Sequence, residues 1–220
     1  MPSDEIKALK DGGWREIAAI DAALESGEID EEGWHRAMAG LVVPAYLAAE
    51  TPWGQSGKSG DHALWEEARS NIADAIDRNG TFLDVGCASG YLMECVVRWS
   101  PHRVEPYGLE IAPELAALAR RRLPQWADRI YVGNALIWDP PQRFDFVRTG
   151  LDYVPPTRRR DLVAHLLGFC DRLIVGSFNE EIEERALEQS VESWGFRVAG
   201  RSELQHRDPR VARRVFWLDP

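Results

Sequence analysis

The stretch from Thr81 to Leu92 constrains the fold of this chain more than any other. It begins as an apolar, β-branched run that stops at Gly86, and after Gly90 the apolar residues recur at helical spacing. The pattern predicts a buried strand, a tight turn bounded by two glycines, and then a helix. Glycine tolerates positive φ and lets a ligand approach the backbone, and the N-terminus of a helix favours negative charge. The stretch therefore predicts a binding site for the anionic end of a small ligand.

The turn reads Asp84-Val85-Gly86-Cys87-Ala88-Ser89-Gly90 and resembles motif I of the class I S-adenosylmethionine-dependent methyltransferases, where a strand is followed by D-V-G-C-G-x-G and a helix. Ala88 replaces the middle glycine of that motif, and it narrows the turn without closing it. The resemblance extends at lower strength from about Asp61 to the C-terminus. It implies S-adenosylmethionine as the cofactor. The residues that it implies as cofactor contacts in this stretch are Asp84, Gly86, Cys87, Ala88, Gly90 and Tyr91.

Composition fits a globular chain with one α/β domain and an appendage, because 45% of the 220 residues are hydrophobic and 28% are charged. Residues 1–50 hold eleven acids and four bases, so they carry seven of the ten net negative charges. The remainder is close to balanced and lacks the basic surface of a nucleic-acid binder. No apolar run approaches the ~20 residues of a membrane span, and the N-terminus has no secretory signal. We expect a cytoplasmic monomer or homodimer without nucleic-acid or membrane partners.

Residues 1–60 form the predicted N-terminal helical cap and gating loop, and residues 61–220 form the predicted cofactor-binding domain. Apolar periodicity predicts cap helices over 4–26 and 31–49. They either cover the core or form a lid over a substrate pocket. The glycine-rich loop that follows carries Trp53, and it either links the two parts or folds over a bound cofactor.

Strands and helices alternate through the second part of the chain. Strands are expected at 81–85, 105–110, 129–133, 143–149 and 172–177, and helices at 62–77, after Gly90, and at 113–122, 156–168 and 180–193. The closing strands, 196–200 and 211–217, have no helix between them and are therefore expected to be antiparallel. The predicted fold is a doubly wound, mostly parallel, Rossmann-like sheet of seven strands with an antiparallel last strand and an N-terminal helical cap.

Glu110 ends the second predicted strand, twenty residues after Gly90. A carboxylate beside the glycine turn can accept hydrogen bonds from both hydroxyls of a ribose, and dinucleotide-binding proteins place an acid about 20 residues on for this purpose. In the resembled family the acid at this position binds the ribose. The alternative is an ordinary surface acid at the end of a strand, and the upstream glycine turn favours the ribose role.

The loop after the third predicted strand is implied by the resemblance to meet the adenine. Asn134 stands where the family often has an acid, and its side chain keeps a carbonyl oxygen that can accept from the adenine amino group. Ala135 is the small residue that follows. Ile111 and Leu136 would flank the adenine ring, and either is equally consistent with an ordinary place in the core.

The fourth predicted strand ends at Thr149, and open parallel sheets bind ligands beyond the carboxyl ends of their strands. Asp152 and Tyr153 are therefore the candidate catalytic residues, although Asp152 is equally consistent with a cap for the helix near Pro156. Methyl transfer from a sulfonium requires mainly orientation and exclusion of water. A base is needed only for a protonated hydroxyl or ammonium acceptor, and the candidates are Asp152, Tyr153 and His62.

These features together predict S-adenosylmethionine-dependent methyl transfer to a hydroxyl or amine of a small molecule. One alternative is a nucleotide-cofactor-binding oxidoreductase, which shares the acid-ended second strand. The spacing of Gly86 and Gly90 is G-x-x-x-G rather than G-x-G-x-x-G and argues against it. The other alternative is a non-catalytic module that binds S-adenosylmethionine. The three cysteines show no metal-ligand spacing, so no metal site is expected.

Overall fold

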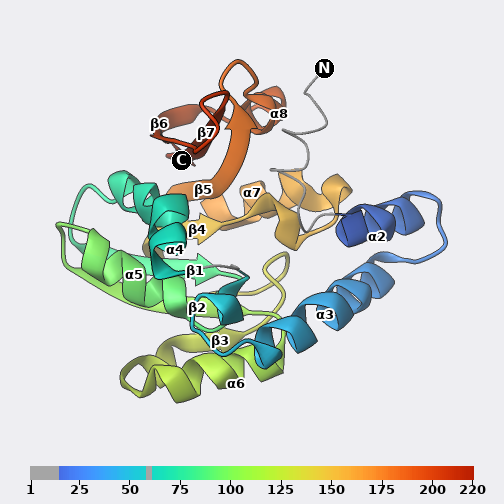
Figure 1. The fold of residues 1–220 in the computed structure, drawn as a ribbon, viewed down its shortest axis with the longest axis horizontal. Coiled ribbons are helices and arrows are strands. Elements are labelled where there is room, and N and C mark those ends of the chain that lie inside the picture. The colour runs from blue at the N-terminus through green and yellow to red at the C-terminus, as the bar shows by residue number, and fades with distance from the viewer. Residues whose placement is uncertain (1–14, 58–60) are drawn as a thin grey trace.

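The structure, a computed structural model, describes residues 15–57 and 61–220, so the predicted helix over 4–26 begins outside the described residues (Figure 1). The strands are β1 Gly80–Val85, β2 Val104–Glu110, β3 Ile130–Val132, β4 Phe144–Thr149, β5 Cys170–Glu181, β6 Val198–Gln205 and β7 Val211–Leu218. The α-helices are α2 Arg15–Glu25, α3 Glu31–Ala48, α4 His62–Arg69, α5 Tyr91–Trp99, α6 Pro113–Arg122, α7 Arg159–Leu167 and α8 Ala186–Ser193.

The strands form one seven-stranded sheet in the order β3-β2-β1-β4-β5-β7-β6. Strands β1 to β5 run parallel to their neighbours, whereas β7 is antiparallel to both β5 and β6. The order reverses direction at β1, so β1 and β4 flank the crevice where open α/β sheets bind ligands. The predicted mostly parallel, Rossmann-like sheet with an antiparallel last strand is confirmed.

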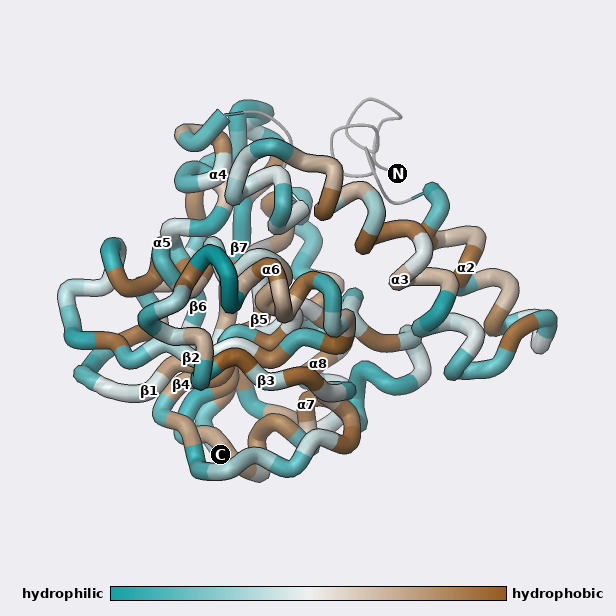
Figure 2. Tube along the Cα trace, turned by 90° about the horizontal axis from the view of Figure 1, so that it is seen from below, coloured by the Kyte–Doolittle hydropathy of each residue, from teal (hydrophilic) through white to brown (hydrophobic). Residues whose placement is uncertain are grey.

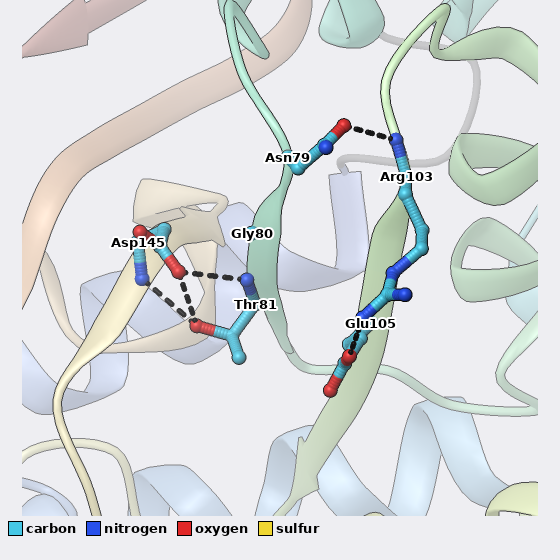
Figure 3. Close-up of a pocket in the computed structure, with 6 residues that line it drawn as sticks. All are labelled: Asn79, Gly80, Thr81, Arg103, Glu105 and Asp145. Carbon is cyan, nitrogen blue, oxygen red and sulfur yellow. Dashed lines mark hydrogen bonds and ion pairs between the residues drawn. The ribbon is translucent and has the colours of Figure 1, made fainter.

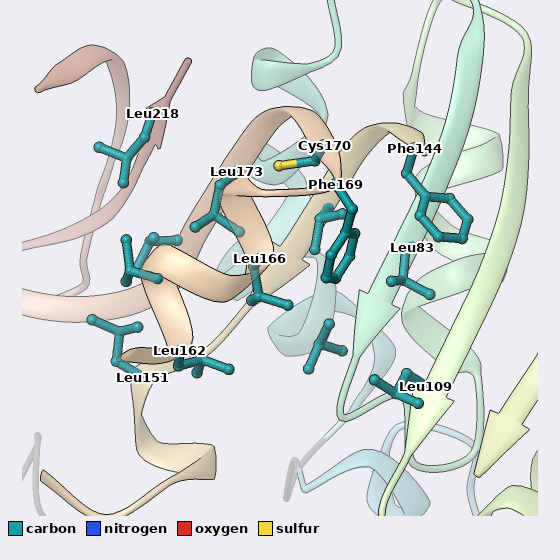
Figure 4. Close-up of a cluster of buried hydrophobic side chains, with 14 of the residues drawn as sticks. Leu83, Leu109, Phe144, Leu151, Leu162, Leu166, Phe169, Cys170, Leu173 and Leu218 are labelled. Atoms are coloured by element: carbon teal, nitrogen blue, oxygen red, sulfur yellow. The ribbon is translucent and has the colours of Figure 1, made fainter. Parts of the chain in front are cut away.

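Alternating residues of the strands bury two different faces. On β1, Phe82 packs under α5 with Trp65 and Val96, whereas Leu83 packs on the opposite face with the leucines of α7 (Figure 4). Successive residues of a strand point to opposite faces of the sheet, and here the residues on both faces are apolar. This is expected of a sheet that is covered by helices on both sides. The core therefore fixes β1 at the centre of the domain and with it the turn that follows.

The two N-terminal helices extend to one side of the sheet (Figures 1 and 2). The indole N–H of Trp34 in α3 donates to Asp21 of α2 at 2.8 Å, which joins the two helices. At its other end α3 reaches the glycine turn, because Tyr46 packs against the cluster that contains Ala88. The C-terminal part of helix α3 therefore lies at the glycine turn. The helix continues through Pro44, although a proline inside a helix usually kinks or ends it.

Several element boundaries differ from those predicted. The strand expected at 196–200 runs from Val198 to Gln205, and the helix expected over 156–168 begins as a 3-10 helix at Pro156 and becomes α7 at Arg159. The helix expected over 180–193 begins only at Ala186, because β5 extends to Glu181 and pairs there with Val211 of β7. The helix expected over 62–77 changes to a 3-10 helix at Ser70. Among the described residues, no helix is long and apolar enough to cross a membrane.

Candidate functional site

The glycine turn has the backbone that the sequence predicts. Strand β1 ends at Val85 and α5 begins at Tyr91, and both Gly86 and Gly90 are left-handed, with φ of 74° and 75°. A Cβ on Gly90 would lie 2.5 Å from a methyl group of Leu123, so a side chain is excluded there by both conformation and space. Gly90 is the N-cap of α5 and offers no side-chain cap, which leaves the first-turn amides of α5 without a capping partner.

Ala88 is the one described non-glycine residue with positive φ, at 47°. An L-residue in this region costs about 1–2 kcal/mol, and such strain is held only where the surroundings over-determine the backbone. The residue that replaces the family's middle glycine therefore has the conformation that the glycine would adopt freely.

Ala88→Gly is accordingly expected to raise the free energy of unfolding by about 0.5–1 kcal/mol, because relief of strain exceeds the added entropy of the unfolded chain. Urea unfolding at pH 7.5 measures it. The matched control is Ala164→Gly, an exposed position inside α7, which is expected to lower the free energy by about 1 kcal/mol. A loss of stability in Ala88→Gly would contradict the strain.

Glu110 ends β2 beside the turn, and its residue is only 5% exposed. One carboxylate oxygen accepts from the amide of Ala88 at 2.8 Å and the other from the amide of Ala112 at 3.0 Å. Burial raises the pKa of Glu110, and these amide hydrogen bonds oppose the rise. A carboxylate has about four acceptor positions, so acceptor capacity remains for a ligand hydroxyl. The amides of Gly86 and Cys87, in contrast, are committed to the carbonyl oxygen of Leu109.

A buried ionic group lies under the turn, which the sequence analysis did not identify. Asp84 of β1 is 1% exposed, and burial raises its pKa to about 6. Arg148 of β4 lies 3.4 Å from it, donates to the hydroxyl of Tyr153 at 2.8 Å, and donates to the carbonyl oxygen of Gly176 at 2.6 Å. Arg148 lies at the buried end of β4, and this position was the signal that could have revealed the group, because a charge in a buried strand needs a partner.

Arg69, the last residue of α4, is a second cation near this group. Its guanidinium lies 4.0 Å from the centre of the Trp65 ring, and burial together with the charge of Arg148 lowers its pKa to about 10. It makes no hydrogen bond or ion pair to the described residues, and the charge of Asp84 acts on it from nearby. A shielded guanidinium without an acceptor is suited to a carboxylate ligand.

Tyr153 covers the turn. Its ring is so close to Gly86 that a Cβ on that glycine would lie 2.7 Å from the ring. The cavity beside it measures about 30 Å³ and is lined by the residues predicted for the adenine and ribose side, including Gly86, Ile111, Asn134 and Ala135. Ligand pockets commonly measure about 300–1,000 Å³, so this cavity is smaller than a nucleoside requires while the Tyr153 ring lies against Gly86.

The remaining predicted residues divide between the site and the core. Asn134 lines the cavity, but its side-chain oxygen already accepts from the amide of Leu136 at 3.0 Å. Leu136 is buried in the core, whereas Ile111 is 44% exposed. Burial raises the pKa of Asp152, which precedes Tyr153, and the hydroxyl of the buried Thr149 donates to the carbonyl of Gly150.

Four of the side chains considered in the sequence analysis, those of Cys87, Tyr91, Trp53 and His62, do not line the cavity. The thiol of Cys87 packs with Met93 under α6. The ring of Tyr91 is buried and packs against Trp65 and Trp53, and His62 lies in the same aromatic group. Trp53 therefore lies against α5 in this structure and not over the cavity. Only the backbone of Cys87 and Tyr91 faces the turn.

A larger cavity of about 450 Å³ lies at the opposite edge of the sheet (Figure 3). Its polar side chains are already paired: Asp145 accepts from Thr81, Asn79 accepts from the amide of Arg103, and Arg103 pairs with Glu105. It lies at the amino ends of β1, β2 and β4, whereas parallel sheets place ligands at the carboxyl ends. The glycine turn is therefore the better candidate site.

No family model matches the sequence. The chain is 30% identical over 166 residues to a ubiquinone biosynthesis O-methyltransferase of Xylella fastidiosa (strain 9a5c), an alignment that covers 71% of this chain and 66% of that relative. The chain thus spans 66% of the length of the curated relative that it matches.

Two solved structures have the same fold. A 1,6-didemethyltoxoflavin N1-methyltransferase of Burkholderia thailandensis, solved with that compound and S-adenosylhomocysteine bound, gives a TM-score of 0.60 at 15% identity and covers 87% of this chain and 90% of its own. The magnesium protoporphyrin IX methyltransferase of Synechocystis PCC 6803, solved with SAM, gives 0.51 at 15% identity and covers 76% and 89%.

Proposed function

We propose, from the premise that this chain belongs to the class I S-adenosylmethionine-dependent methyltransferase family, that it transfers a methyl group from S-adenosylmethionine to a hydroxyl or amine of a small molecule. The observation that carries the proposal is the glycine turn joined to Glu110 through the amide of Ala88. This pairing joins the turn after β1 to the acid at the end of β2 at the carboxyl edge of the sheet, where a nucleoside cofactor is expected.

The residues around the turn fit the parts of the cofactor. Arg69 would pair with the carboxylate of its amino-acid tail, and the uncapped start of α5 would add amide donors. Glu110 would use its remaining acceptor capacity for the ribose, and Ile111 and Asn134 line the adenine side. When bound, the cofactor supplies a methyl group that is already activated. The chain's own residues then need only to orient the acceptor and exclude water.

The proton of a hydroxyl or ammonium acceptor goes to Asp152 in this proposal. Burial raises the pKa of Asp152, and this brings a carboxylate closer to the range in which it accepts a proton at neutral pH. Burial also raises the pKa of Tyr153, so its hydroxyl stays protonated and acts as a hydrogen-bonding group beside Arg148.

Support for a small acceptor comes from the net charge of −10, which disfavours nucleic acid, and from the two compared methyltransferases, which are named for 1,6-didemethyltoxoflavin and for magnesium protoporphyrin IX. We also propose a cytoplasmic location, because Cys87, Cys95 and Cys170 are free thiols.

Calorimetry with S-adenosylmethionine, S-adenosylhomocysteine and NAD tests the cofactor, and mass spectrometry after incubation with a panel of phenols and amines tests transfer. We expect both adenosyl ligands to bind, NAD not to bind, and at least one acceptor to gain a methyl group. Binding of NAD alone would support the oxidoreductase alternative. Binding of the adenosyl ligands without transfer to any acceptor would support the non-catalytic module.

Arg69→Ala is expected to weaken S-adenosylmethionine and S-adenosylhomocysteine about tenfold, because their carboxylate loses a charge-assisted partner. Methylthioadenosine, which lacks the amino-acid tail, should bind the variant and the wild type equally. Arg103→Ala, which removes an exposed arginine at the opposite edge of the sheet, is the control. Equal weakening of all three ligands would assign Arg69 to the structure and not to the tail.

A further inference from the structure

Arg122, the last residue of α6, reaches the glycine turn from outside the cavity. One guanidinium nitrogen donates to the carbonyl oxygen of Ser89 at 2.6 Å, and another pairs with Glu94 of α5 at 2.5 Å. The side chain is 18% exposed. Basic residues at the C-terminus of a helix are normally solvated, but Arg122 is largely covered and is bonded to the backbone of the turn.

Ser89 is fully buried, and each of its polar side-chain and carbonyl groups has a partner. Its hydroxyl donates to the carbonyl oxygen of Pro52 at 3.0 Å and lies 2.7 Å from the hydroxyl of Ser56. Hydrogen bonds of Ser89 therefore connect the turn both to α6, through Arg122, and to the loop that follows α3. A shift of the Ser89 peptide would break all of these bonds together.

The strained residue Ala88 lies between two groups that are held by side-chain hydrogen bonds. The amide of Ala88 donates to Glu110 on the cavity side, and the carbonyl oxygen of the next residue, Ser89, accepts from Arg122 on the outer side. A left-handed L-residue persists only where its surroundings fix it. Glu110 is also the residue proposed to bind the ribose. The hydrogen bond from Arg122 to Ser89 therefore keeps the turn at a fixed position relative to the carboxylate of Glu110.

We propose that Arg122 is a positioning residue for cofactor binding, which acts through the carbonyl of Ser89 and does not touch the cofactor. The inference rests on the proposed function. Without Arg122 the turn relaxes at Ala88, and the uncapped start of α5 and Glu110 lose their fixed separation.

Arg122→Ala tests this, with Arg120→Ala as a matched control. Arg120 lies on the same helix and also donates to a backbone carbonyl, that of Ile130, away from the turn. Arg122→Ala is expected to raise the Kd of S-adenosylhomocysteine and the KM for S-adenosylmethionine about tenfold, with kcat unchanged. Arg120→Ala should leave both constants unchanged, and Arg122→Lys, which keeps a donor, should recover part of the loss. Equal effects of Arg122→Ala and Arg120→Ala on these constants would overturn the proposal.

Amide hydrogen exchange at residues 86–90 separates this inference from the proposed function. Arg122→Ala is expected to accelerate exchange there relative to Arg120→Ala, whether or not a ligand is present. If the wild type binds neither adenosyl ligand, the proposed function fails while this exchange difference still reports on the turn. Unchanged exchange in Arg122→Ala would overturn the positioning role.

Discussion

Glu110→Ala is expected to weaken binding of S-adenosylmethionine and S-adenosylhomocysteine together by about 1.5–3 kcal/mol, roughly 10–150-fold. Two losses add. The ribose loses a charged acceptor, and the amide of the strained Ala88 loses the carboxylate that holds it. Isothermal calorimetry at pH 7.5 measures both affinities.

Two further variants make the result specific. Glu110→Gln keeps one carbonyl acceptor without the charge and should lie between the wild type and the alanine variant. Glu105→Ala removes an exposed acid from the same strand and should leave affinity unchanged. If Glu110→Ala folds and binds with wild-type affinity, Glu110 has no place in the site.

Arg148→Met is expected to lower the free energy of unfolding by about 3–5 kcal/mol, because it leaves the carboxylate of Asp84 buried without its cation. The carbonyl of Gly176 and the hydroxyl of Tyr153 lose their donor as well. Urea unfolding at pH 8 measures the loss.

The pH dependence of this loss has a definite sign. The pKa of Asp84 is raised from 3.8 to about 6, so its contribution to stability is greatest below about 3.8 and is lost as pH rises through 6. Removing Arg148 raises that pKa further, so the deficit of the variant should be larger at pH 8 than at pH 5. The double variant Asp84→Asn, Arg148→Met should lose less stability than Arg148→Met alone. A deficit below 1 kcal/mol at pH 8 would mean that the pair is not an effective ion pair.

The centre of the sheet could be predicted from the sequence because β1 is covered on both faces and is therefore a nearly continuous apolar run. The glycine turn could also be predicted from the sequence, since Gly86 and Gly90 lie between a buried strand and an amphipathic helix. The start of α8 was not, because residues 180–185 have no local preference strong enough to oppose pairing of β5 with β7.

The charged residues of the site were harder to find, for a physical reason. Arg69 ends an amphipathic helix, where a basic residue is normally solvated, and its burial depends on residues far along the chain. Arg122 has the same local pattern, and only the packing of α6 against the turn distinguishes it from a surface arginine. Local sequence specifies which residues are charged, whereas tertiary contacts specify which charges are enclosed.

The ring of Tyr153 against Gly86 has a thermodynamic consequence. A protein whose receptive conformer is a minor fraction of the ensemble has a measured dissociation constant equal to the intrinsic one divided by that fraction. Displacing the Tyr153 ring from Gly86 would add such a factor to the dissociation constant of the cofactor, and that factor would not depend on the concentration of protein or ligand.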